Sequence, residues 1–498
     1  MWCHEHLMRG KKHVVWVLAA TIVGAVTVAY GETRVVPLIA VGERYDSNVF
    51  LFDTTGQDVQ PEDYVTSAVP QVVVIHRGTL VNGSFYIGAT GEHYVRNSDL
   101  DYVGFNAGTT LDLTQVVNRI SPRLTLRVSD NFLYTPLPPS FLAGGDPSQV
   151  SNPLIRGIQA FRVNTTSNFG SATGSYLLSP TSSFLASYSH ALVRFGGIPG
   201  EGIGQSAQSL VFDSTNQTVV AGPSWSVSRS DIIRLNYQYQ FTQLAGFDDI
   251  ITHSGTVSWA RTFTPSLSST ASVGATALLD PFVDLPTRQT IVEAGSIYPN
   301  GGLSVTWRSM STGLQTGGGS GGDSSTLGSV GINLPALPGV QTLGTGFPGG
   351  LGIPGGTTLL LNYSAGVYPM YFLAAGPAFS QVIGLSASHS LTDRLTVIGG
   401  ANYASNVATS TSSSPQGDFS FKSYATNLAL NYLITPTVRA SVIHSYGNYD
   451  GRVSGVNFVF DRQTVMFAIS MTLDRSIFSP SALGTGQVPE ASGSDRKQ

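Results

Sequence analysis

Polar and apolar residues alternate along many short stretches of this chain, most clearly between residues 231 and 243. A period of two is that of a β-strand with two unlike faces. One face carries Leu235, Tyr237, Tyr239 and Phe241, and the other carries Arg234, Asn236, Gln238 and Gln240. Aromatic residues opposite amides are typical of a membrane-spanning strand. We therefore expect the first set to face lipid and the second to face a water-filled lumen.

Other stretches repeat this alternation with period two rather than 3.6. Their apolar faces include Leu124, Leu126 and Val128, then Val257 and Trp259, Leu428, Leu430 and Tyr432, and Val465, Phe467, Ile469 and Met471. The opposite faces place Arg123, Arg127 and Arg439 on the lumen side, together with Ser84, Tyr86 and Glu92. Residues 64 to 76 and 184 to 195 alternate poorly, and no facing is predicted for them.

Short turn signals punctuate the chain between these stretches. Ser or Thr followed by Pro or Asp recurs after an aliphatic or aromatic residue, as at Ser121-Pro122, Ser179-Pro180, Thr264-Pro265, Thr392-Asp393 and Thr435-Pro436. Such residues favour tight reversals because Pro fixes φ and Ser, Thr and Asp bond their own backbone. With further turns near 78, 229 and 309, two strands per turn plus the first and last give 18 strands, within a range of 16 to 20. Longer connections alternate with the short turns, as in outer-membrane barrels whose short turns are periplasmic.

One Gly-rich segment, residues 311 to 357, interrupts this rhythm and predicts no regular element. Two interpretations stay open. It forms an extracellular loop, or it folds into the lumen, because its Leu, Ile, Val and Phe residues are costly to leave in water.

Composition supports a barrel over a soluble protein. Only 11% of the 498 residues are charged, well below the quarter that is typical of soluble domains. The net charge of −4 gives no basic surface, so a nucleic-acid partner is excluded.

The two termini predict processing and compartment. Basic residues precede an apolar run from Val14 to Val28, and Ala29-Tyr30-Gly31 suits signal peptidase, so residues 1–31 are a predicted signal peptide. The alternative is an uncleaved anchor helix. No later stretch is apolar for long enough to form a spanning helix, which leaves a barrel as the way to cross the membrane. The expected domains are a barrel over residues 32–473 and a polar tail over residues 474–498.

No enzymatic or metal-binding arrangement is recognisable. The histidines are scattered, Cys3 is the single cysteine, and no His, Cys or Asp cluster has ligand spacing. We therefore predict no catalytic residue, no cofactor and no metal. His444, in a predicted strand, is expected at an interface or in the lumen.

Residues 35–51 carry a resemblance to a known family. Pro37, Glu43, Tyr45, Ser47, Asn48 and Val49 match the pattern of Pro followed by Glu-x-Tyr-x-Asp/Ser-Asn and an aliphatic residue. This pattern resembles the first strand of β-barrel porins related to the outer-membrane proteins associated with PEP-CTERM exopolysaccharide systems. The resemblance implies a barrel in the cell envelope and a link to polysaccharide secretion. The barrel-assembly machinery is an expected partner, although the last strand stops at Leu473 and not at the terminal Phe of the usual outer-membrane ending.

The functional hypothesis is an outer-membrane barrel that passes solutes or takes part in polymer export. The competing class is a non-conducting anchor or adhesin that is plugged by its own Gly-rich insert. An enzyme inside a barrel is a third class, but it requires a His/Ser pair that the sequence does not reveal. Because Arg123, Arg127, Arg234 and Arg439 are predicted to face the lumen, we expect a pore that prefers anions.

Overall fold

The structure of the chain is a computed structural model. It describes residues 31–50, 62–137, 163–196, 213–245, 248–279, 282–284, 289–292, 295–309, 356–368, 378–408, 420–453 and 456–473. Residues 1–30 of the predicted signal peptide, most of the Gly-rich insert and the predicted polar tail lie outside these residues. Within them, no helix is long and apolar enough to cross a membrane.

The described chain is almost entirely β-strand. The main sheet contains 18 strands. They are β1 (Gly31–Asp46), β2 (Asp63–Gly78), β3 (Asn82–Tyr94), β4 (Tyr102–Asp112), β5 (Leu124–Leu137), β6 (Val163–Ser179), β7 (Ser182–Phe195), β8 (Ser214–Ser226), β9 (Asp231–Leu244), β10 (Ile250–Thr264), β11 (Leu267–Leu278), β14 (Ser296–Arg308), β15 (Thr357–Tyr368), β16 (Ala378–Ser390), β17 (Leu395–Ala408), β18 (Ser420–Thr435), β19 (Val438–Val453) and β20 (Val456–Thr472). Four small elements lie in the connections, namely η1 (Ser98–Leu100), α2 (Thr114–Val117), β12 (Phe282–Asp284) and β13 (Gln289–Val292).

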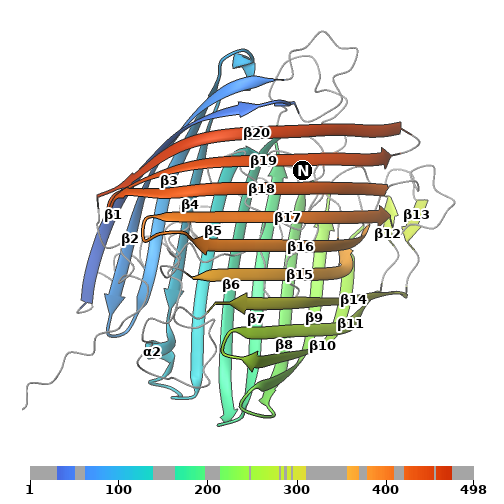
Figure 1. Cartoon of the computed structure of the whole chain (residues 1–498). Coiled ribbons are helices and arrows are strands. Elements are labelled where there is room, and N and C mark those ends of the chain that lie inside the picture. The colour runs from blue at the N-terminus through green and yellow to red at the C-terminus, as the bar shows by residue number, and fades with distance from the viewer. Residues whose placement is uncertain are drawn as a thin grey trace, which may run out of the picture.

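The sheet closes on itself as a barrel. Each strand pairs antiparallel with the next, and β1 also pairs with β20, from Leu38 opposite Thr472 to Asp46 opposite Thr464. Figure 1 shows the two ends of the colour scale side by side there, with β15 to β20 crossing in front of the steeper strands of the far wall. Closure leaves this sheet without a free edge. The predicted all-β antiparallel barrel of about 18 strands is confirmed.

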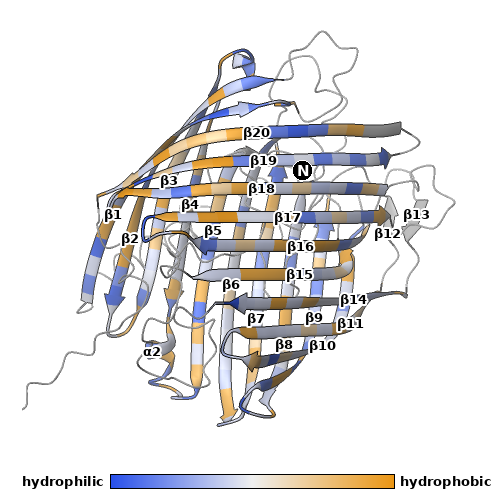
Figure 2. Cartoon of the chain, viewed as in Figure 1, coloured by the Kyte–Doolittle hydropathy of each residue, from blue (hydrophilic) through white to orange (hydrophobic). Residues whose placement is uncertain are grey.

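Register fixes two faces around the whole wall. On β1, Val36, Leu38 and Ala40 are buried on the inward face, whereas Val35, Ile39 and Val41 are exposed on the outward face. Because opposite partners share a face in a β ladder, the pairings carry this assignment from strand to strand and back to β1. Figure 2 shows the resulting alternation of hydropathy along the strands.

The two ends of the barrel have different connections. At one end, called here the short-turn end, pairs such as β6–β7, β10–β11 and β18–β19 are joined by two residues each. At the other, called here the loop end, the connections include residues 47–62, 138–162 and 409–419. The expected asymmetry is therefore present. Two predicted connections were wrong in detail. Residues 113–123 carry the helix α2 instead of a tight turn. Between β19 and β20, where the alternation predicts a longer connection, only residues 454–455 separate the two strands.

The Gly-rich insert joins the barrel at the short-turn end. It follows β14 and precedes β15, which are antiparallel neighbours with Arg308 opposite Thr358. Ser309 and Thr357 hold its ends together, since the Ser309 amide donates to the Thr357 carbonyl at 2.8 Å and the Thr357 amide donates to Ser309 Oγ at 2.7 Å. The extracellular interpretation was therefore wrong about the end of the barrel, because the alternation of strand direction assigns this connection to the end of the short turns.

Two strands, β2 and β7, do not alternate clearly in sequence, and the structure gives the physical reason. On β2 the inward residues Val65, Val69 and Val73 are apolar and buried, so both faces of the strand are apolar in part. On β7 the inward face mixes Ser187 and Ser189 with Val193. Where the inner wall is itself packed, a lumen-facing residue need not be polar, and period two disappears from the sequence.

Candidate functional site

The outward surface is apolar and carries aromatic residues near the short-turn end. Trp225, Trp259 and Trp307 are exposed there, together with Tyr176, Phe184 and Tyr432. Phe105, Tyr64 and Tyr424 are exposed towards the loop end. Apolar outer faces between aromatic girdles are characteristic of transmembrane barrels, because aromatic rings prefer the two membrane interfaces. The chain is an outer-membrane β-barrel.

Strand β9, the clearest strand in the sequence, has its predicted sets on opposite faces. Leu235 and Tyr237 are exposed on the outward side, with Tyr239 and Phe241 half-buried beside them. Tyr237 Oη contacts His253 Nδ1 of β10, and the Tyr239 ring meets the same imidazole edge-on at 5.3 Å. These positions agree with the predicted facing, but their contact with lipid stays a prediction.

The inward face of β9 forms a chain of amides. Gln238 Nε2 donates to Gln240 Oε1 at 3.2 Å, and Gln240 Nε2 donates to Thr242 Oγ1 at 3.3 Å. Asn216 of β8 donates to the same hydroxyl at 3.0 Å. Asn236, on the same face, pairs with Thr256 of β10. The arrangement offers hydrogen-bond donors and acceptors without net charge.

The four predicted lumen arginines all lie near the short-turn end. Arg123 is exposed and precedes β5, Arg439 is the second residue of β19, and Arg127 and Arg234 are the fourth residues of β5 and β9. Arg127 Nη2 lies 3.8 Å from Asp112 Oδ2, so a nearby acid offsets part of its charge. Their effect on permeating ions stays a prediction.

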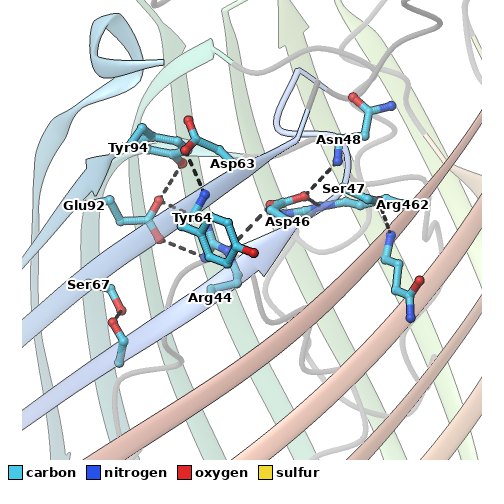
Figure 3. Close-up of polar contacts among 12 residues, drawn as sticks. Arg44, Asp46, Ser47, Asn48, Asp63, Tyr64, Ser67, Glu92, Tyr94 and Arg462 are labelled. Atoms are coloured by element: carbon cyan, nitrogen blue, oxygen red, sulfur yellow. Dashed lines mark hydrogen bonds and ion pairs between the residues drawn. The ribbon is translucent and has the colours of Figure 1, made fainter. Parts of the chain in front are cut away.

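The best-connected charges lie elsewhere, on the inward face near the loop end. We call Arg44, Asp46, Glu92 and Arg462 the seam cluster, because they join β1 to β3 on one side and to β20 on the other (Figure 3). Arg44 forms a two-pronged contact with Glu92, at 2.9 Å and 3.3 Å. Arg462 does the same with Asp46, at 2.9 Å and 2.5 Å. Arg44 Nε also lies 3.5 Å from Asp46 Oδ2.

The seam cluster is buried and electrically balanced. No member exposes more than 8% of its surface, and two guanidinium groups face two carboxylates. Buried charges are tolerable only when they are paired and hydrogen-bonded. Tyr94 Oη adds a hydrogen bond of 2.7 Å to Glu92, and the Asn48 amide adds one of 3.2 Å to Asp46. Glu92, which was predicted to face the lumen, lies on the inward face and is neutralised by Arg44.

A further carboxylate, that of Asp63, anchors the chain around the seam cluster. Asp63, fully buried at the start of β2, accepts hydrogen bonds from the backbone amides of Arg96 and Asn97, at 2.9 Å and 2.8 Å, and from Asn97 Nδ2 at 2.9 Å. Beside it, a small core of Val49, Val65, Tyr94 and Leu100 packs with Phe50 and Tyr102. The β3–β4 connection is therefore fixed against the wall at the loop end.

Asp101, in the same connection, forms a titratable pair with His93 near the end of β3. Asp101 accepts a hydrogen bond from the Tyr94 amide and contacts His93 Nδ1, both at 2.7 Å. Partial burial raises the pKa of Asp101, but the Tyr94 amide and His93 together outweigh it and hold that pKa below its ordinary value.

The seam cluster explains part of the motif at residues 43–49. Asp46 and Asn48 face inward, and Asn48 Nδ2 reaches the Asp461 carbonyl at 3.5 Å. Ser47 bonds Gln463 of β20 twice, through its amide at 3.0 Å and its hydroxyl at 2.7 Å. The motif therefore lies where the first and last strands join. The sequence did not single out Arg44, Asp46, Asp63 or Arg462. A usable signal was present, because Arg44 and Asp46 each follow a motif residue, Glu43 and Tyr45, and therefore lie on the opposite face of the strand.

The remaining candidate ligands do not form a centre. His444 lies on the outward face, where its Nε2 is 3.0 Å from Gln463 Nε2 of the neighbouring strand. Within the described ranges, no group of three or more His, Cys, Asp or Glu residues is placed to hold a metal ion.

No known family profile and no curated protein matches this sequence. Among solved structures, the chain is similar to OpdQ of Pseudomonas aeruginosa, with 11% identity, coverage of 89% of this chain and 97% of that chain, and a TM-score of 0.37. The outer membrane protein OpdK of the same organism is 10% identical, with 88% and 99% coverage and a TM-score of 0.39. OccAB4 of Acinetobacter baumannii is 11% identical, with 88% and 98% coverage and a TM-score of 0.39. The fold assignment rests on the strand pairing described above.

Proposed function

We propose that the protein is a channel for small polar solutes across the outer membrane. The observation that carries this proposal is the chemistry of the inward face from β6 to β11. It is lined by hydroxyl and amide side chains, including Ser189, Asn216, Gln238, Gln240, Ser254 and Thr276. Such groups replace the hydration of a polar solute without binding it too tightly to leave.

Because its charges are balanced, the seam cluster supports only a modest ion selectivity of the channel. Because Arg44, Asp46, Glu92 and Arg462 neutralise one another, the loop end adds no strong field to the lumen from these residues. The short-turn end retains Arg127, Arg234 and Arg439 on the inward face. We therefore retain the anion preference as part of the proposal, with its source at the short-turn end.

Single-channel recording in planar bilayers tests conduction directly. The purified barrel should give discrete conductance steps, and a barrel without residues 311–355, rejoined by a short linker, should do so as well. If only the deletion variant conducts, the insert plugs the barrel, and the non-conducting anchor or adhesin becomes the better assignment. Absence of conductance from both proteins overturns the channel.

Polysaccharide export is a second candidate, and it rests on the resemblance of residues 35–51. A lumen lined by uncharged hydroxyl and amide groups also suits a carbohydrate chain, which is recognised through hydrogen bonds. Deleting the gene should then reduce surface polysaccharide, and a conducting wild-type barrel should be blocked by oligosaccharides of that polymer. Unchanged polysaccharide with normal conductance would leave the solute channel and remove the export role.

A further inference from the structure

A row of polar residues crosses the outward wall of the barrel between β5 and β8. Asp130 lies opposite Gly170, Gly170 opposite His190, and His190 opposite Gln217. Asn168 joins the row from β6, because its Nδ2 donates to Asp130 Oδ1 at 3.0 Å. We call these five residues the wall patch.

The wall patch faces out of the barrel, since its neighbours on the other parity face in. The adjacent row, one residue nearer the loop end on each strand, contains Phe169, Ala191 and Asn216, which are buried on the inward side. On β5, Asp130 shares its face with the apolar residues Leu124, Leu126 and Val128 on one side and with Phe132 and Tyr134 on the other.

The depth of the wall patch makes it costly in lipid. It lies between the aromatic row near the short turns, where Leu124 pairs with Tyr176 and Tyr176 with Phe184, and the row towards the loop end, where Phe105 pairs with Tyr134. A carboxylate at such a depth is unfavourable because hydrocarbon offers no hydrogen bonds. Among the described residues, Asp130 accepts a hydrogen bond from one donor, Asn168. The side chains of His190 and Gln217 form no hydrogen bond within the same part of the chain.

On β6 the wall patch continues into small side chains, although Tyr188 of β7 lies opposite Ala172 on the same face. Gly170, Ala172 and Gly174 follow one another on the outward face of β6, with Ala186 beside them on β7. Gly170 also makes room for the acid, because a Cβ there would lie 3.2 Å from Asp130 Oδ2. Small residues let backbones approach closely at membrane interfaces, where polar groups then bond across the contact.

We propose that the wall patch is the contact site for a second copy of this chain in the outer membrane. The patch is complementary to itself, since the acid lies on β5 and the imidazole and amide lie on β7 and β8, with Gly170 between them. A two-fold axis along the membrane normal at Gly170 turns the acid side of one copy towards the imidazole side of the other. Association then supplies Asp130 with donors that lipid lacks.

Disulfide cross-linking tests this dimer with the full chain. The single natural cysteine, Cys3, is replaced by Ser, and Ala172→Cys then introduces a thiol beside the proposed axis. Ala401→Cys is the matched control, because Ala401 faces outward on β17, on the wall opposite β6. Oxidation in membranes should give a cross-linked dimer from Ala172→Cys and none from Ala401→Cys. Monomer from both variants, dimer from both, or an adduct of the Ala172→Cys variant with a different protein overturns the proposal.

Removing the charge supplies a second, independent readout. Asp130→Asn should weaken dimerisation about tenfold, which is the loss expected for one buried hydrogen bond to a charged group. The variant should still fold, as shown by a shift in its electrophoretic mobility when it is heated. Asp130→Leu should abolish the dimer. Unchanged dimerisation of both folded variants would show that the wall patch is not the contact.

Discussion

At the scale of single residues, Asp46 is the member of the seam cluster that contacts three different residues. It meets Arg462 across the closing strands, lies near Arg44 on its own strand, and accepts the Asn48 amide. Removing one partner from a buried ion pair costs more than the pair itself contributes, because the other charge is left without compensation.

Asp46→Ala should therefore lower the free energy of unfolding by about 3–5 kcal/mol. Urea unfolding in lipid vesicles, followed by tryptophan fluorescence, measures the change. Asp461→Ala is the control, because Asp461 is exposed next to Arg462 and its loss should stay within about 0.5 kcal/mol. Combining Asp46→Ala with Arg462→Ala should cost less than the sum of the single changes. Equal effects at positions 46 and 461 would contradict the described pairing.

Asp101 gives the loop end a dependence on pH. A carboxyl with a lowered pKa stabilises the fold above its ordinary pKa of about 3.9 and loses this contribution as the pH falls through the lower, folded value. Asp101→Asn should therefore melt below the wild type at neutral pH, and the gap should narrow as the pH drops below about 4. Melting curves of both proteins from pH 7 to pH 3 test this. A difference in melting temperature that stays constant with pH would contradict this prediction. As a control, Asp99→Asn, on the same connection, should melt at the wild-type temperature throughout this pH range.

At the scale of strands, alternation was informative where the two faces meet different surroundings. Strand β9 could be assigned from its sequence because amides face the inside and aromatics the outside along most of its length. On β1 the inward face changes from Val36 and Leu38 to Arg44 and Asp46, so neither face has one character. The seam cluster also depends on which residues of β1 and β20 are opposite one another. That register is set by closure of the whole sheet, which local sequence does not encode.

A pair of neighbouring substitutions on β9 tests the facing. Tyr239→Arg places a charge on the outward side and should cost about 2–4 kcal/mol at mid-membrane depth. Gln238→Arg places the same charge inside and should be tolerated. The folded fraction in refolding assays with lipid vesicles is the measurement. Equal losses from the two changes would mean that both faces are covered alike.

At the scale of the whole barrel, strand number and class were predictable, whereas the side reached by each connection required the full strand order. Turn signals gave 18 strands, with the turn near Ser309 among them, but the insert that follows this turn was still interpreted as an extracellular loop because its length is that of the long connections. The antiparallel pairing of β14 with β15 shows that the insert joins the barrel at the short-turn end. Local turn chemistry thus counts strands well and orients long connections poorly.

Ion selectivity is a property of the whole barrel that the short-turn end should set. Reversal potentials in a salt gradient should show an anion preference that falls when Arg127→Ala and Arg234→Ala are combined. Arg194→Ala is the matched control, because Arg194 faces outward on β7 beside Asp213. A cation-selective wild type, or an equal shift from the control, would remove the inward arginines from the mechanism.

The contact between Asp46 and Arg462 can form only late in the synthesis of the chain. These two residues are 416 positions apart in the chain. At synthesis rates of about 5–20 residues per second, roughly 20–80 s pass between making the first and the second. Throughout that interval Asp46 lacks the guanidinium that it meets across the closing strands. An interrupted chain lacks Arg462, so its Asp46 keeps only the Arg44 and Asn48 contacts of its own segment, and only a complete chain can balance this carboxylate across the closing strands.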